Sequence, residues 1–192
     1  MIYRILIDVD SVVADLVGET LVWLNRKFPN KPLKYEDITD FYFLDTDKFN
    51  IINKEQADYI KKLWSGRYWA YHLPVMDGAV QGVEELKKLG DIYFVTSPWA
   101  PSHTWAYDRT TWINRFFKVP ADNVIFTGHK GLIRGDVLID DCPKYIKQWA
   151  EEGNPEKVII YDQPWNRKKD LETFKRAHNW KEIVKCIKKM KS

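Results

Sequence analysis

The chain has 192 residues, which suits one domain or a core with an insertion, and 45% of them are hydrophobic, which is enough for a buried core. Its 30 basic and 27 acidic residues give a net charge of +3, too small to predict binding to a nucleic-acid polymer. Two cysteines without a C-x-x-C pair indicate a reducing compartment and exclude a zinc site of that kind. Since no apolar stretch has the length of a membrane span, we expect a soluble, cytoplasmic protein without a membrane partner.

The first predicted element is a buried strand over residues 2–7, a short apolar run rich in β-branched residues. Asp8 and Asp10 follow it, at the edge where open α/β sheets bind their ligands. In an extended segment their side chains point the same way, so the two carboxylates can converge. Two such charges repel unless a cation lies between them or one of them keeps its proton. The alternative is an Asp-rich turn that caps the next helix, and both interpretations stay open.

An aromatic segment interrupts the expected alternation of strands and helices. An amphipathic helix is predicted over residues 12–28, and the chain then combines helical spacing with many aromatic side chains until Pro74. We interpret residues 31–73 as a small helical insertion above the edge of the sheet. Its aromatic cluster either forms a small core of its own or offers flat apolar faces to a ligand such as a base.

Helices and strands alternate through the rest of the chain. We predict helices over 78–89, 104–117, 145–152 and 180–191, and strands over 91–96, 123–127, 136–139 and 157–161. This alternation is typical of a three-layer α/β fold with a parallel, Rossmann-like sheet. The lysines of the last helix are predicted to form a solvated face.

Polar residues follow four of the predicted strands. They are Asp8 and Asp10, Thr96 and Ser97, Asp140 and Asp141, and Asp162. Because the carboxyl ends of parallel strands meet at one edge, three or four carboxylates could face one pocket, and oxygen ligands without nearby His or Cys suit Mg²⁺. Lys130, in a glycine-flanked loop, could bring its charge to a phosphate, and the hydroxyls could donate to phosphoryl oxygens. A solvated loop lysine and a turn of Ser/Thr type are the alternatives.

Four motifs in this order resemble those of haloacid-dehalogenase-type phosphatases, and more closely those of the 5'(3')-deoxyribonucleotidases. The latter carry D-x-D-G-V-x-A-D, then T-S-P, then a lysine shortly before a strand that ends L-I-D-D. The matching pieces of this chain are residues 8–15, residues 96–98, Lys130 and residues 136–141. The chain departs from the family at Ser11, where glycine is usual, and at Ala100, where some relatives carry a lysine that touches substrate.

The resemblance implies a haloacid-dehalogenase-like α/β core over residues 1–30 and 74–192, with residues 31–73 as a helical cap. It also implies a Mg²⁺-dependent phosphatase that dephosphorylates deoxyribonucleoside 5'(3')-monophosphates, such as dUMP or dTMP, through an aspartyl-phosphate intermediate. Asp8 would attack phosphorus. Asp10 would protonate the leaving nucleoside oxygen and then activate water, which requires a raised pKa.

The same resemblance assigns roles to further residues. The metal would be bound by the Asp8 carboxylate, the Asp10 backbone carbonyl and one aspartate of the Asp140–Asp141 pair, with Asp141 favoured. The groups expected to hold phosphoryl oxygens are Thr96, Ser97, Lys130 and Arg109. The candidates for stacking on the base are Tyr42, Phe43, Trp64, Tyr68 and Trp69.

Two other functions fit part of the pattern. One is a phosphatase for another small phosphorylated metabolite, with the same chemistry on a different substrate. The other is a non-hydrolytic phospho-aspartate switch, since receiver domains also combine acidic residues with a Thr or Ser and a Lys. The acid at Asp10 argues against the switch, because a switch needs a durable acyl-phosphate. Base preference, the choice between 5' and 3' phosphates, and a homodimeric state are left open.

Overall fold

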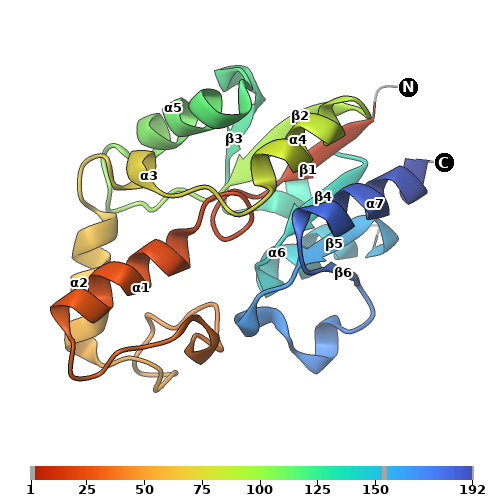
Figure 1. Ribbon diagram of the computed structural model, residues 1–192. Coiled ribbons are helices and arrows are strands. Elements are labelled where there is room, and N and C mark those ends of the chain that lie inside the picture. Colours follow the sequence, from red (N-terminus) through yellow and green to blue (C-terminus); the bar gives the residue numbers. More distant parts are fainter. Residues whose placement is uncertain (1–2, 153–154, 192) are drawn as a thin grey trace.

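The computed structural model describes residues 3–152 and 155–191, and these contain one six-stranded parallel sheet (Figure 1). The strands are β1 (Arg4–Ile7), β2 (Asp91–Thr96), β3 (Val124–Phe126), β4 (Val137–Asp140), β5 (Val158–Tyr161) and β6 (Lys175–Ala177). Their order, β3-β2-β1-β4-β5-β6, places β1 between β2 and β4. The carboxyl ends of these three strands therefore lie side by side, at the edge where such sheets bind ligands.

Helices cover both faces of the sheet. The α-helices of the described ranges are α1 (Leu16–Lys27), α2 (Lys54–Trp64), α3 (Trp69–His72), α4 (Ala79–Lys87), α5 (Trp105–Phe117), α6 (Pro143–Glu151) and α7 (Trp180–Lys191). The short 3₁₀ helices are η1 (Tyr35–Asp37), η2 (Ala121–Asn123), η3 (Lys130–Leu132), η4 (Pro155–Lys157), η5 (Pro164–Asn166) and η6 (Lys169–Leu171). Along β1, Ile5 and Ile7 belong to the core under α4, α5 and α7, whereas Leu6 belongs to a second core under α6. The predicted three-layer α/β fold is confirmed, and burial on both faces explains why the central strands are continuous apolar runs.

Helix α1 lies with the insertion rather than on the sheet. It begins at Leu16 because the Asp15 side chain caps it, accepting a hydrogen bond from the Gly18 N–H at 2.9 Å. Its apolar stripe faces α2, and the Trp64 indole donates to the Thr20 hydroxyl at 2.8 Å across that contact. Figure 1 shows α1 and α2 side by side and away from the strands. The division into a core and a cap stays a prediction, and this packing argues for a first boundary at the start of α1.

The structure differs from the sequence expectations in two further places. The edge strand β6 was not predicted, because it has three residues, two of them basic, and lacks an apolar run. Helix α4 begins at Ala79 and not at residue 78 as predicted, and Gly78 precedes it at φ +74° without a side-chain cap. Glycine suits this left-handed conformation because it has no Cβ to clash.

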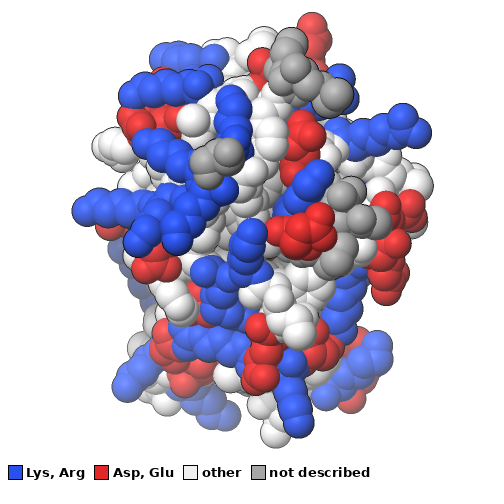
Figure 2. All heavy atoms as spheres, turned by 90° about the vertical axis from the view of Figure 1, so that its right-hand side faces the viewer, with Lys and Arg blue, Asp and Glu red and all other residues white. Residues whose placement is uncertain are grey.

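The lysines of α7 form the predicted solvated face. All of them are exposed, and Lys188 pairs with Glu85 of α4 at 3.2 Å. Figure 2 shows basic and acidic side chains interspersed on the side of the molecule where α7 ends. Within the described ranges, none of the helices has the length and apolarity that crossing a bilayer requires.

Candidate active site

Three carboxylates meet where the central strands end. Asp8 follows β1, Asp140 ends β4, and the Asp8 N–H donates to the Ile139 carbonyl at 2.9 Å, which fixes the two strand ends against each other. Asp141 follows directly, and one carboxylate oxygen from each of the three residues lies within 4.8 Å of the others. All three side chains are buried. Three buried carboxylates this close require positive charge between or beside them.

Lys130 supplies part of that charge. It opens the short helix η3, which packs on α6, and its side chain is only 1% exposed. The ammonium is ion-paired with the Asp8 carboxylate and with Asp140 at 2.7 Å, and it lies 4.6 Å from the centre of the Tyr145 ring. Burial alone would lower the pKa of Lys130, but the adjacent Asp140 and Asp8 outweigh burial and raise this pKa. The lysine is therefore charged and locks two strand ends together.

The two neighbouring aspartates differ in how their oxygens are used. In Asp140, Oδ2 accepts from Lys130 and Oδ1 accepts from the Cys142 N–H at 2.8 Å. In Asp141, Oδ2 accepts from the Trp165 indole at 2.9 Å, whereas the buried Oδ1 has no hydrogen-bond partner. Burial, followed by the charges of Asp8 and Asp140, raises the pKa of Asp141 well above its usual range. An orphaned carboxylate oxygen in a surplus of negative charge fits a hard divalent cation, so the residues suit Mg²⁺.

Asp10 stands beside this group and is held by Arg109. The Arg109 guanidinium hydrogen-bonds to Asp10 Oδ1, is fully buried, and lies 5.1 Å from the Trp105 ring and 5.6 Å from the Trp112 ring. Burial raises the pKa of Asp10 to about 6, against the opposing charge of Arg109. Arg109, expected to hold phosphate, is thus placed against Asp10 and behind the cavity wall.

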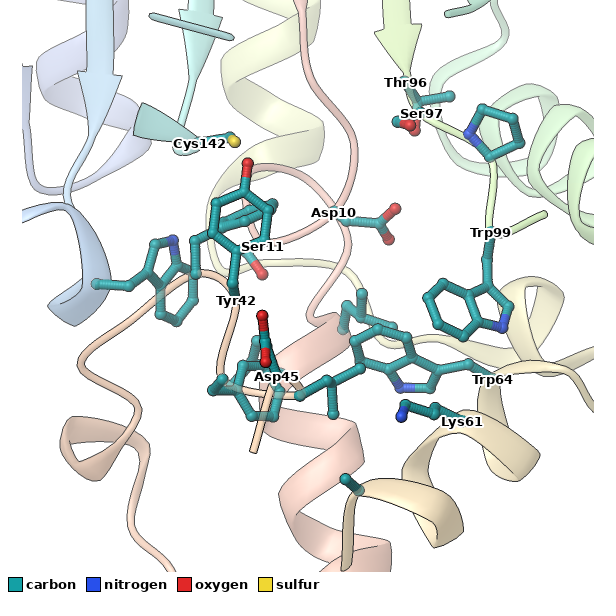
Figure 3. A pocket seen from close by; sticks show the side chains of 18 of the residues that line it. Asp10, Ser11, Tyr42, Asp45, Lys61, Trp64, Thr96, Ser97, Trp99 and Cys142 are labelled. Carbon is teal, nitrogen blue, oxygen red and sulfur yellow. The ribbon is translucent and has the colours of Figure 1, made fainter. Parts of the chain in front are cut away.

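A cavity of about 680 Å³ opens beside these groups (Figure 3). Asp8 and Asp10 line it together with Thr96 and Ser97 from the end of β2, and Figure 3 shows the hydroxyls and Asp10 on the same side of the cavity. Thr96 is buried, and its Oγ1 has no hydrogen-bond partner. A buried hydroxyl without a partner, in the wall of a cavity that Asp8 and Asp10 also line, could donate to an incoming oxygen anion.

Aromatic side chains form much of the remaining wall. Of the predicted stacking residues, Tyr42, Phe43 and Trp64 line the cavity. Tyr68 and Trp69 are not among the residues that line it: Tyr68, which directly precedes α3, has a left-handed conformation and is half-exposed. Composition does not predict this position. Helix α3 is only one turn long, and its orientation depends on its packing against α5.

Sequence reasoning missed three tryptophans of the same wall, namely Trp99, Trp105 and Trp165. Trp99 follows the T-S-P motif and meets Trp64 edge to face with ring centroids 5.4 Å apart. Trp105 begins α5 and is buried, and it also lines the cavity. The position of Trp99 directly after a polar strand end was the signal that could have found it.

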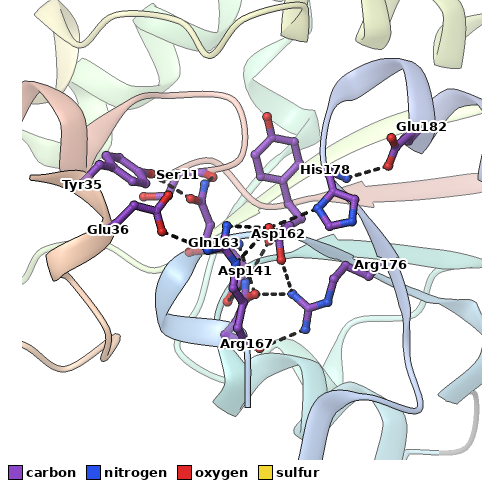
Figure 4. A network of polar contacts seen from close by, with 12 residues as sticks. Ser11, Tyr35, Glu36, Asp141, Asp162, Gln163, Arg167, Arg176, His178 and Glu182 are labelled. Atoms are coloured by element: carbon purple, nitrogen blue, oxygen red, sulfur yellow. Dashed lines mark hydrogen bonds and ion pairs between the residues drawn. The ribbon is translucent and has the colours of Figure 1, made fainter. Parts of the chain in front are cut away.

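The expectation that Asp162 could join the other carboxylates is wrong. Its carboxylate pairs with Arg167 at 2.9 Å, Arg176 at 2.7 Å and His178 at 3.2 Å (Figure 4). This network lies beside the edge strand β6, which carries Arg176. Burial alone would raise the pKa of Asp162, but hydrogen bonds from these groups outweigh it and lower the pKa. Asp162 therefore organises the edge of the sheet and does not line the cavity.

Ser11, which departs from the family motif, is buried in the cavity wall at φ +60°. This left-handed conformation is what glycine adopts without strain, so the serine accepts a cost of about 1 kcal/mol. Its carbonyl accepts a hydrogen bond from the Gln163 side chain at 2.6 Å. This hydrogen bond holds the turn in the left-handed conformation although the position carries a serine.

Comparisons with known proteins match the sequence of the chain to one family. The family model described as "5' nucleotidase, deoxy (Pyrimidine), cytosolic type C protein" matches residues 1–192. A 5'(3')-deoxyribonucleotidase of Bacillus subtilis is 29% identical over 186 residues, covering 95% of this chain and 97% of that protein. The human mitochondrial 5'(3')-deoxyribonucleotidase is 25% identical over 189 residues, covering 96% of this chain and 81% of that protein.

Solved structures show the same fold at low identity. A haloacid dehalogenase-like protein from Agrobacterium tumefaciens superposes with a TM-score of 0.66 at 14% identity, covering 100% of both chains. A haloacid dehalogenase-like hydrolase from Streptococcus pneumoniae gives 0.60 at 15% identity, covering 97% of this chain and 98% of that one. The predicted haloacid-dehalogenase-like fold is therefore confirmed.

Proposed function

Because the chain belongs to the family of deoxy (pyrimidine) 5' nucleotidases of cytosolic type C, we propose that it is a Mg²⁺-dependent phosphatase for deoxyribonucleoside monophosphates. It is a phosphoric monoester hydrolase, as are the relatives named 5'(3')-deoxyribonucleotidase. One observation carries the proposal: Asp8 lines an aromatic-walled cavity, and a carboxylate oxygen of the buried Asp141 lies within 4.8 Å of an Asp8 carboxylate oxygen. A metal, a phosphoryl group and a flat base need such an arrangement of groups.

Mg²⁺ would be held by the Asp8 carboxylate, the Asp10 backbone carbonyl and Asp141 Oδ1. When bound, it supplies positive charge to the phosphoryl oxygens and fixes their orientation. Asp140, the other candidate of the pair, holds Lys130 and the Cys142 N–H with its two oxygens. We therefore assign Asp140 to the positioning of Lys130 and Asp141 to the metal.

The reaction proceeds in two displacements at phosphorus. A carboxylate oxygen of Asp8 forms a bond to phosphorus while the bond to the nucleoside oxygen breaks, and that oxygen takes the proton of Asp10. Asp10, now ionised, removes a proton from water, whose oxygen attacks phosphorus and releases phosphate from Asp8. The pKa of about 6 supports this role, because such a carboxyl can both give and take a proton near neutral pH.

The surrounding donors stabilise the charge of the transferring group. Thr96 and Ser97 would donate hydroxyl hydrogen bonds to its oxygens, and the Lys130 ammonium would neutralise them while it orients Asp8. Lys130 is fixed by burial and by two carboxylates, so it need not reorganise during the reaction. Arg109 orients Asp10 instead of touching phosphate.

The nucleoside would lie along the aromatic wall. Tyr42, Phe43 and Trp64 remain our stacking candidates, to which the geometry adds Trp99, and apolar packing at the sugar would favour 2'-deoxyribose. A volume of about 680 Å³ lies within the range of small-molecule sites, so dUMP or dTMP can be accommodated. We further propose a cytoplasmic location.

Replacement of Asp8 tests the proposed function. Asp8→Asn should abolish phosphate release from dUMP and dTMP, measured by a colorimetric phosphate assay, with an unchanged circular dichroism spectrum. Asp122→Asn, at an exposed position in η2, is the matched control and should retain wild-type turnover. Near wild-type activity of Asp8→Asn would refute the nucleophile.

A substrate screen separates the alternatives. A clear preference for sugar phosphates over deoxyribonucleotides would support the phosphatase for another small metabolite and remove the nucleotide assignment. An acyl-phosphate that persists for minutes without turnover would support the non-hydrolytic switch.

A further inference from the structure

The segment from Gln163 to Lys168, which follows β5 and contains η5, contacts three separate parts of the molecule (Figure 4). It reaches the proposed metal ligand Asp141, the motif turn at Ser11 and the predicted insertion at Glu36. We call this segment the η5 loop. None of its residues was expected in the site from the sequence, and the mechanism above leaves it without a role.

Two side chains of the η5 loop hold Asp141 from both ends. The indole N–H of Trp165 donates to Asp141 Oδ2 at 2.9 Å, and the Asn166 amide donates to the Asp141 carbonyl at 2.9 Å. Trp165 is 2% exposed and Asn166 is fully buried. With its main chain and one carboxylate oxygen fixed in this way, Asp141 cannot rotate away, and its other oxygen stays unpartnered.

The insertion braces the same tryptophan. The Tyr35 ring, from η1, packs on the Trp165 ring with centroids 5.8 Å apart and a tilt of 41°. Its hydroxyl donates to the Gln163 side chain at 2.9 Å, and Gln163 in turn donates to the Ser11 carbonyl. A chain of contacts therefore runs from the insertion through the η5 loop to both the proposed metal ligand and the motif turn.

We propose that Trp165 is a positioning residue that orients Asp141 for the metal ion, and that Tyr35 of the insertion braces it. The proposal rests on the proposed function in one respect, namely that Asp141 binds the metal. Groups that hydrogen-bond to a metal ligand fix its orientation, and their loss typically weakens metal binding about 10- to 100-fold. Completion of the metal site thus depends on the insertion being docked on the η5 loop.

The test measures metal binding without substrate. Trp165→Phe keeps an aromatic ring but removes the N–H, and Mn²⁺ affinity is read from the free-ion signal in electron paramagnetic resonance. Trp149→Phe is the matched control, because Trp149 is another buried tryptophan whose N–H donates to a backbone carbonyl, that of Ile133, at 3.1 Å. We expect Mn²⁺ affinity to fall about 10- to 100-fold for Trp165→Phe and to stay within about threefold for Trp149→Phe.

A second variant tests the brace and covers a folding failure of the first. Tyr35→Phe keeps the ring on Trp165 and removes the hydrogen bond to Gln163, so Mn²⁺ affinity should fall about two- to tenfold. If Trp165→Phe does not fold, the Mn²⁺ affinity of Tyr35→Phe tests the proposal instead. A two- to tenfold loss of affinity supports the proposal, and an affinity equal to that of the wild type overturns it.

The outcomes separate this inference from the proposed function. Mn²⁺ binding by Trp165→Phe within threefold of the wild type would overturn the positioning role and leave the phosphatase intact. A wild-type protein that binds no Mn²⁺ would remove the metal site, and the positioning role with it. A loss of affinity shared equally by Trp165→Phe and Trp149→Phe would indicate general loosening of the fold and would also overturn the proposal.

Discussion

Replacing Lys130 by methionine removes the cation that holds the strand ends together. The Lys130 ammonium is 1% exposed and ion-paired with Asp8 and Asp140, the latter at 2.7 Å. Methionine keeps much of the volume but leaves two buried carboxylates facing each other. Removal of one partner from a buried ion pair typically destabilises a protein by about 3–5 kcal/mol. For a chain of this length, the melting temperature should fall by roughly 6–20 °C.

Urea unfolding in the presence of EDTA measures this loss. Lys147→Met is the control, since Lys147 pairs with Asp170 on the surface, where such a pair contributes at most about 1 kcal/mol. The loss in free energy of unfolding of Lys130→Met should be smaller when Mg²⁺ is added, because the metal ion then balances the charge of the carboxylates. The loss should also be smaller at pH 5, because burial raises the pKa of Asp140 to about 6 and this carboxyl takes up a proton below that pH. A metal-free Lys130→Met protein within about 1 kcal/mol of the wild type would refute this electrostatic account.

Three further predictions concern neighbouring groups. Asp141→Asn should abolish Mn²⁺ binding in calorimetry, whereas Asp140→Asn should chiefly lower stability, and the reverse result would exchange their roles. Ser11→Gly should raise the free energy of unfolding by about 0.5–1 kcal/mol in urea, because glycine adopts the φ of +60° without strain. A fall in the free energy of unfolding would show that the contacts of the serine side chain contribute more than the relief of strain. Burial raises the folded pKa of Asp10 to about 6 from an ordinary 3.8, so its stabilising effect is complete below pH 3.8 and is lost as pH rises through 6. The metal-free wild type should therefore gain melting temperature between pH 7 and pH 5 relative to Asp10→Asn, and parallel curves for the two proteins would contradict the raised pKa.

The sequence was most informative where a local pattern determines a position in the fold. Apolar runs followed by carboxylates predicted that Asp8, Asp140 and Asp141 end neighbouring strands of a parallel sheet, and the structure brings them within 4.8 Å of one another. Such patterns are reliable because a strand buried on both faces has to be apolar, and its carboxyl end has to meet the ligand edge. The roles assigned to these residues stay proposals until they are tested.

Asp162 shows why the same pattern can mislead. It follows β5 just as Asp140 ends β4, yet its partners are Arg167, Arg176 and His178. Arg176 lies on β6, a strand too short and too polar to be predicted, so the charges that draw Asp162 away from the cavity were not visible in the sequence. Whether a strand-end carboxylate faces a pocket thus depends on tertiary neighbours.

The aromatic wall was predictable in kind but not residue by residue. Tyr42, Phe43 and Trp64 line the cavity, whereas the adjacent Tyr68 and Trp69 do not. The helical period of α1 likewise showed an apolar stripe without showing that it covers α2 instead of the sheet. Composition and periodicity describe which side chains are apolar, and the packing partner decides which way they face.

The central claim is that a phosphoryl group is transferred to Asp8 beside a metal held by Asp8 and Asp141. A crystal structure with Mg²⁺ and beryllofluoride, a mimic of an acyl-phosphate, tests it most directly. We predict a beryllium–oxygen bond to the Asp8 carboxylate and Mg²⁺ at about 2.0–2.1 Å from oxygens of Asp8 and Asp141. Beryllofluoride bound away from Asp8, or a metal ion coordinated without Asp141, would contradict the account.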